Sequence, residues 1–296
     1  MTRAPSHAML HRLLILAAAA LFSTGGAAIK SAHLDGWQVA AFRSAWAAIA
    51  LYLLLPGGRA RWSRGAVVVG VVYAGTMILF VTANKLTTAA ATIFLQDTAP
   101  LWILLMGPRL LHEPVRRRDL VTMAPVALGL ACFFVGYGPP AKTAPDPLRG
   151  NILAAVSGVF WAGTVVGFRR LGRAGGTGAG ASAIVAGNVI ACAVCLPFAF
   201  PVATGGLHDW LIVSYLGIIQ IGLAYVCLVR GLAGVPALEA SLLLLAEPVL
   251  NPIWTWLVHG ERPGAWALAG GAIILAATTV RSAIETRRGA PAQRPT

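Results

Sequence analysis

The chain has 296 residues, of which 57% are hydrophobic and only 11% are charged, and its formal net charge is +13. Soluble domains have about a quarter of their residues charged, and here the apolar residues form long runs instead of alternating with polar ones. This composition argues against a soluble enzyme, a nucleic-acid-binding protein and a secreted scaffold, and it predicts an integral membrane protein.

Ten apolar segments follow one another along the chain, each close to the ~20 residues that a membrane-spanning helix needs. They cover residues 12–30, 37–55, 65–84, 87–107, 119–137, 150–168, 181–200, 209–230, 237–258 and 264–281. Short connections rich in Gly and Pro separate them. The first apolar run is longer than that of a signal peptide, so we expect an uncleaved helix. The predicted fold class is an all-α integral membrane protein with ten transmembrane helices.

Lysines and arginines are distributed unevenly over the predicted connections. With the N-terminus placed in the cytoplasm, 17 of the 23 fall on the cytoplasmic side, 5 fall in the outer loops, and Arg43 remains inside a helix. Cytoplasmic loops of membrane proteins carry the excess of Lys and Arg. We therefore expect a multi-pass protein of a bacterial-type cytoplasmic (inner) membrane, with both termini in the cytoplasm.

The second half of the chain repeats the first. A shift of 148 residues places 91–114 on 239–262, so that Pro100 meets Pro248. Each unit has five predicted helices, an odd number, so the second must be inverted relative to the first, as in secondary transporters whose site lies at the repeat interface. The predicted division is a cytoplasmic N-terminus (1–11), a first repeat (12–137), a periplasmic linker (138–149), a second repeat (150–281) and a basic cytoplasmic tail (282–296).

Several motifs resemble those of the EamA family of ten-helix carriers, within the drug/metabolite transporter superfamily. They are AEPV at 246–249, HGER at 259–262, TAPL at 98–101, HEP at 112–114, Arg43 in AFRSAW, Trp161 in VFWAGT and Tyr225 in GLAYVCLVRGL. The resemblance implies a carrier, but the family moves amino acids, nucleotide-linked sugars, vitamins and cationic drugs. The chain departs from the family at Asp97, where small or hydroxyl residues are usual, so a relative's substrate is not carried over.

Two carboxylates, Asp97 and Glu247, lie about ten residues into their helices and hence near the membrane centre. Because the two helices are repeat mates, we expect both acids to approach one central cavity from opposite sides. Asp97 either binds a cation or proton or bridges two helices by hydrogen bonds. Glu247 either takes part in transport or stabilises a kink where Pro248 frees the Leu244 carbonyl. The predicted helix breaks are Pro100, Pro248 and Pro252.

Further polar and aromatic residues are candidates for the substrate path. Arg43 lies well inside a predicted helix, where it either holds a carboxylate or snorkels to the outer surface. Asn251 and Trp254 follow Glu247 at i+4 and i+7, so they add an amide and an aromatic wall on the same face. The remaining candidates, each also open to a packing role, are Tyr225, Gln96 and Trp161. Arg43 and an acid in one cavity would suit a zwitterionic amino acid.

The predicted function is secondary active transport of a small polar or cationic metabolite, amino acid-like or drug-like, by alternating access and in the direction of efflux. The alternatives are an importer or facilitative exchanger, and a lipid flippase or membrane scaffold. Zinc-spaced histidines, G-x-S-x-G and Walker A motifs are missing from the sequence, so we expect no enzyme, cofactor or metal. The expected partners are a small-molecule substrate, the lipid bilayer and protons, without nucleic acid; a homodimer stays open.

Overall fold

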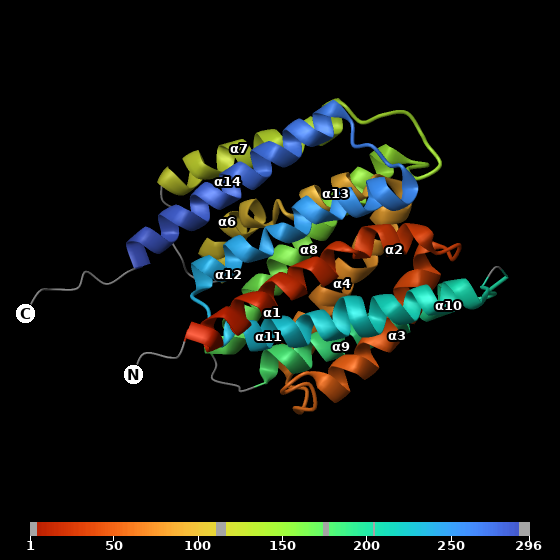
Figure 1. Cartoon of the computed structure of the whole chain (residues 1–296), viewed down its shortest axis with the longest axis horizontal. Helices are drawn as coiled ribbons and strands as arrows, with labels where there is room; N and C mark the ends of the chain where they lie inside the picture. Colours follow the sequence, from red (N-terminus) through yellow and green to blue (C-terminus); the bar gives the residue numbers. More distant parts are fainter. Residues whose placement is uncertain (1–4, 111–116, 174–177, 204, 290–296) are drawn as a thin grey trace, which may run out of the picture.

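The computed structural model describes residues 5–110, 117–173, 178–203 and 205–289, and this part of the chain is helical almost throughout (Figure 1). The HEP residues at 112–114 lie outside it. Its helices in chain order are α1 (Pro5–Ser23), α2 (Gly25–Ser31), α3 (Gly36–Leu54), α4 (Arg64–Leu86), α5 (Ala89–Gln96), α6 (Ala99–Leu110), α7 (Arg117–Val135), α8 (Pro147–Arg173), α9 (Ala179–Cys195), the 3₁₀ helix η1 (Leu196–Phe198), α10 (Leu207–Ser214), the π-helix η2 (Tyr215–Leu223), α11 (Ala224–Leu232), α12 (Ala237–Leu244), α13 (Ala246–His259) and α14 (Ala265–Gly289).

The described residues contain eight helical segments that are long and apolar enough to cross a bilayer. These candidate spans are Met9–Ser31, Gly36–Leu54, Arg64–Leu86, Ala89–Leu110, Pro147–Arg173, Ala179–Phe198, Leu207–Leu232 and Leu242–His259. Two shorter apolar helices, Met123–Val135 in α7 and Ala265–Val280 in α14, pack against each other along one edge of the bundle (Figure 1). The prediction of an all-α, multi-pass membrane protein is confirmed.

The helices run between two ends of an elongated bundle. The start of α1 and the end of α14 lie at one end in Figure 1, which we call the terminal end. The loop between α7 and α8 lies at the other, which we call the linker end. Residues in the last turns of α2, α4 and α13 therefore belong to the linker end, and those in the last turns of α6, α8 and α11 belong to the terminal end.

Helix starts follow from local capping residues. The Asp35 carboxylate accepts from the Gln38 backbone N–H at 2.9 Å, while the Gln38 amide oxygen accepts from the Asp35 N–H, which forms a capping box at the start of α3. Ser63 and Thr88 cap α4 and α5 by accepting backbone N–H groups three residues later. These bonds satisfy amides that lipid leaves without a partner.

Two spans are broken in the middle. α5 ends at Gln96 and α12 ends at Leu244, and the next helices, α6 and α13, begin after one or two turn residues. Pro100 and Pro248 lie in the first turn of those next helices, where a missing N–H is tolerated. Each proline removes the donor for the carbonyl four residues earlier, and those positions are Gln96 and Leu244. The breaks therefore come just before the two prolines.

The predicted break at Pro252 is wrong. α13 continues through this proline as far as His259. A single lost backbone bond bends a long helix without ending it, and transmembrane helices tolerate proline where neighbouring groups satisfy the freed backbone.

Two helices, α4 and α9, approach each other closely through a pair of glycines. A Cβ at Gly187 of α9 would lie 2.8 Å from the Gly70 carbonyl oxygen of α4, so glycine permits this contact. The span Leu207–Leu232 contains the π-helix η2, and this π-helix packs against α3. π-helical turns are rare and occur frequently at functional sites.

Candidate functional site

A cavity of about 370 Å³ lies among the broken helices. This volume falls in the range of small-molecule sites. Its wall is formed mainly by aromatic, aliphatic and a few charged side chains: Phe22, Arg43, Tyr73, Met77, Phe80, Gln96, Asp97, Ala99, Pro100, Ile103, Trp161, Val165, Gln220, Ile221, Tyr225, Leu228, Leu244, Leu245, Glu247, Pro248 and Thr278. Ile103, Val165 and Leu228 lie in the second halves of their spans. The cavity thus extends from the middle of the spans towards the terminal end.

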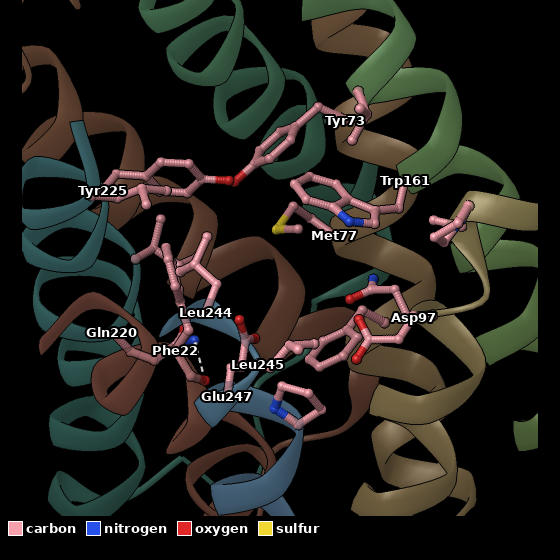
Figure 2. Close-up of a pocket in the computed structure, with 18 of the residues that line it drawn as sticks. Phe22, Tyr73, Met77, Asp97, Trp161, Gln220, Tyr225, Leu244, Leu245 and Glu247 are labelled. Atoms are coloured by element: carbon pink, nitrogen blue, oxygen red, sulfur yellow. Dashed lines mark hydrogen bonds between the residues drawn. The ribbon is translucent and has the colours of Figure 1, made fainter. Parts of the chain in front are cut away.

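The two predicted carboxylates both line this cavity. Asp97 lies in the break between α5 and α6, and Glu247 lies in the first turn of α13. Figure 2 shows their carboxylates facing the interior from two sides. Neither carboxylate forms a hydrogen bond or ion pair with another described side chain or backbone group, so both remain available to a ligand.

Arg43 on α3 brings a positive charge to the same cavity. Its residue exposure is 2%, so the predicted alternative of snorkelling to the surface does not apply. One terminal nitrogen donates to the Met77 sulfur at 3.0 Å, and the Nε atom has no partner. Within the described chain no carboxylate lies within ion-pair distance of Arg43. A buried guanidinium with an unused donor is suited to binding a carboxylate or phosphate.

Aromatic rings form a large part of the cavity wall. Tyr225 packs edge-on against Phe22, with ring centroids 5.2 Å apart, and against Tyr73 at 6.4 Å. In Figure 2 the hydroxyl ends of Tyr73 and Tyr225 point towards each other, and Trp161 lies beside Met77. Such rings provide a surface for an organic cation.

Two glutamines add neutral hydrogen-bonding groups to the wall. The Gln96 amide donates to the Ser157 hydroxyl at 2.8 Å. The Gln220 amide, on the π-helix η2, donates to the Phe22 carbonyl at 3.1 Å and joins this span to α1 (Figure 2). Its Oε1 atom has no partner and is a free acceptor beside the cavity. The π-helical stretch therefore positions one of the polar groups of the site.

Two predicted residues lie elsewhere. The Asn251 amide lies against Gly26 of α2, and the Trp254 indole donates to the Ser23 hydroxyl at 2.9 Å. They share a face of α13 with Glu247, as predicted, but they lie about 6 and 10 Å further along the helix axis. At that depth the face packs against α1 and α2 instead of the cavity.

The structure therefore gathers most of the sequence candidates around one space. Asp97, Glu247, Arg43, Tyr225, Gln96 and Trp161 line it together with Pro100 and Pro248. Sequence reasoning missed Tyr73 and Met77 on α4. The position of Tyr73 could have indicated the site. Tyrosine is typical of the membrane interface, so a tyrosine in the middle of a span suggests a polar role there.

The comparisons with known proteins agree with this architecture. The pseudopaline exporter CntI from two strains of Pseudomonas aeruginosa (UCBPP-PA14 and PAO1) is 26% identical over 285 residues, which cover 94% of this chain and 96% of the relative. A protein of known crystal structure aligns with 95% of this chain and 98% of its own, with a TM-score of 0.61 and 23% identity, which shows a shared fold. The model of the EamA-like transporter family matches residues 9–135 and 148–282, and the chain belongs to that family.

Proposed function

We propose that this transporter is a secondary active carrier that exports a small polar or cationic metabolite by alternating access. The observation that carries the proposal is the cavity at mid-membrane depth, which two unpaired carboxylates, a buried guanidinium and several aromatic rings line together. Ionisable residues inside a membrane are costly, and they mark substrate or ion pathways. The similarity to a Pseudomonas protein that is an exporter supports the direction of export.

The charges of the cavity favour a substrate with both an amine and a carboxylate. An ammonium group would pair with Asp97 or Glu247, and the carboxylate would pair with Arg43 through two parallel hydrogen bonds. The aromatic wall would cover the carbon skeleton between them. In the absence of substrate, one acid is free to take up a proton, so we propose protons as the coupling ion.

We further propose ten spans arranged as two inverted repeats, 12–137 and 150–281, joined by a periplasmic linker at 138–149 and followed by a cytoplasmic tail at 282–296. Three observations support this arrangement. The two short apolar helices α7 and α14 pair with each other. The pairing of α4 with α8 and α9 is matched by that of α11 with α1 and of η2 with α3. The family model covers both halves, and the excess of Lys and Arg on one side supports the proposal that both termini lie in the cytoplasm.

A thermal-shift screen followed by a flux measurement tests the proposal. Purified carrier is screened against amino acids, amines and nucleotides, because a ligand of the folded state raises the melting temperature. The hit is then followed in proteoliposomes with and without a pH gradient, which also separates export from import or exchange. The double variant Asp97→Asn/Glu247→Gln should show no flux, whereas Glu239→Gln, an acid at the terminal end outside the cavity, should retain it. Unchanged flux in the double variant would contradict the proposal.

A further inference from the structure

Lys30, at the end of α2, is buried at the linker end of the bundle. The ammonium group donates to the carbonyl oxygens of Asn84 at 2.8 Å, Thr87 at 2.7 Å and Thr143 at 2.5 Å. It also lies 3.1 Å from a carboxylate oxygen of Glu261, and each side chain of this ion pair is 3% exposed. All these partners come from chain turns and helix ends, so Lys30 holds α2, α4 and the α7–α8 linker together.

Glu261, just after α13, completes the contact from the second half of the chain. Its other carboxylate oxygen accepts the backbone N–H of Ala89 at 2.7 Å, which is the first residue of α5. Free N–H groups at a helix start favour a negative charge, and free carbonyls at a helix end favour a positive one. The carbonyls at the end of α4 thus stabilise the charge of Lys30, and the N–H groups at the start of α5 stabilise the charge of Glu261.

This pair lies on the linker side of the stretch that separates two cavities, and Glu261 lines the outer of the two. A second cavity of about 540 Å³ at the linker end is lined by Thr88, Ala91 and Glu261, whereas the central cavity begins at Gln96. Only about 7 Å of α5 separates Ala91 from Gln96. The side chains in this interval, from Thr92 to Leu95, are all buried.

The barrier is made by three helices that belong to both halves of the chain. α2 and α5 come from the first half, and α13, which contacts both, comes from the second. A Cβ on Gly26 of α2 would lie 2.7 Å from the Asn251 amide oxygen of α13 and 2.9 Å from the Ala89 Cβ of α5. These contacts pack α2, α5 and α13 closely together between the two cavities.

We propose that the Lys30–Glu261 ion pair is the latch that keeps the linker end closed in this state, and that it must part for substrate to leave through the second cavity. The inference rests on the proposed alternating access and adds the residues that control one of its two gates. The Arg12–Glu239 pair at the terminal end also joins the two halves, but its side chains are 46% and 34% exposed. Water competes for such a pair, so it is held far more weakly than a buried one.

Thiol labelling tests the latch without any substrate. Thr92→Cys is introduced after the four native cysteines are replaced; Thr92 lies in the closed interval, and its hydroxyl bonds only to its own helix, at Thr88. The purified protein is treated with a charged, membrane-impermeant maleimide. We expect Glu261→Gln to speed labelling by about tenfold, since the variant keeps an acceptor for Ala89 but loses the charge that holds Lys30.

Matched variants separate the latch from general loosening. Glu239→Gln removes the exposed counterpart and should leave the rate at Thr92→Cys unchanged. A reporter at the opposite end, Ser182→Cys on α9, should label at the wild-type rate in Glu261→Gln. If Glu261→Gln does not fold, the neutral pair Lys30→Met/Glu261→Gln is measured instead, with the same expected increase. Equal rates with and without the latch, or an equal increase at both reporters, would overturn the proposal, whereas absent flux in the wild-type protein would count against the proposed function alone.

Discussion

The two broken spans, α5–α6 and α12–α13, differ in how firmly the bundle surrounds them. Of an 18-residue stretch in Ala89–Leu110, 56% is buried inside the protein, against 17% of Leu242–His259. The second span turns Val249, Ile253 and Leu257 outwards, where lipid is the solvent. The break in α5–α6 is thus surrounded by other helices, whereas much of α12–α13 faces lipid. We infer that α12–α13 has more freedom to move.

The acids also occupy different positions relative to the breaks. Asp97 is the C-terminal cap of α5, whereas Glu247 lies in the first turn of α13. Free N–H groups at the start of a helix favour a negative charge, and free carbonyls at the end of a helix do not. The field at the start of α13 therefore favours the charge of Glu247 although no group bonds to it, and the charge of Asp97 depends more on what enters the cavity.

Neutralising each acid separately should give the largest difference between the two spans. We expect Asp97→Asn to weaken binding of an amine-containing substrate about 100-fold, because removing a partner from a buried charge pair costs about 2–5 kcal/mol. For Glu247→Gln we expect about a tenfold loss of affinity. Titration calorimetry on the two variants measures the ratio directly. A greater loss for Glu247→Gln would reverse the assignment made from the helix ends.

Removing each proline should sharpen the contrast in mobility. In Pro248→Ala the Leu244 carbonyl regains its donor, so α12–α13 can straighten, and we expect the transport rate to fall severalfold with the KM little changed. In Pro100→Ala the break is held by surroundings such as Thr98 and Leu95, which are fully buried, and we expect less than a twofold change. Initial rates over a range of substrate concentrations separate the two effects. Equal losses would show that packing does not fix the first break.

The sequence predicted the elements better than the contacts between them. Prolines and intramembrane acids mark the broken spans because their physical cost is local and can be read from neighbouring residues. Helical periodicity placed Asn251 on the same face as Glu247, but a face does not define depth, and the cavity ends before that turn. The Lys30–Glu261 pair was missed since it joins helix ends from opposite halves of the chain. Its burial depends on the loop carbonyls of Thr87 and Thr143, which no local pattern indicates.

The two tryptophans that follow the breaks should show the smallest difference. The Trp254 indole donates across to Ser23 of α1, whereas the Trp102 indole donates to Thr98, one turn earlier in its own span. Hydrogen bonds between membrane helices contribute about 0.6 kcal/mol on average. We expect Trp254→Phe to lower the melting temperature of the purified carrier by a degree or two more than Trp102→Phe, as measured by thermal unfolding of the two variants side by side. A larger drop for Trp102→Phe would mean that α13 owes its position to α2 and the latch, and not to α1.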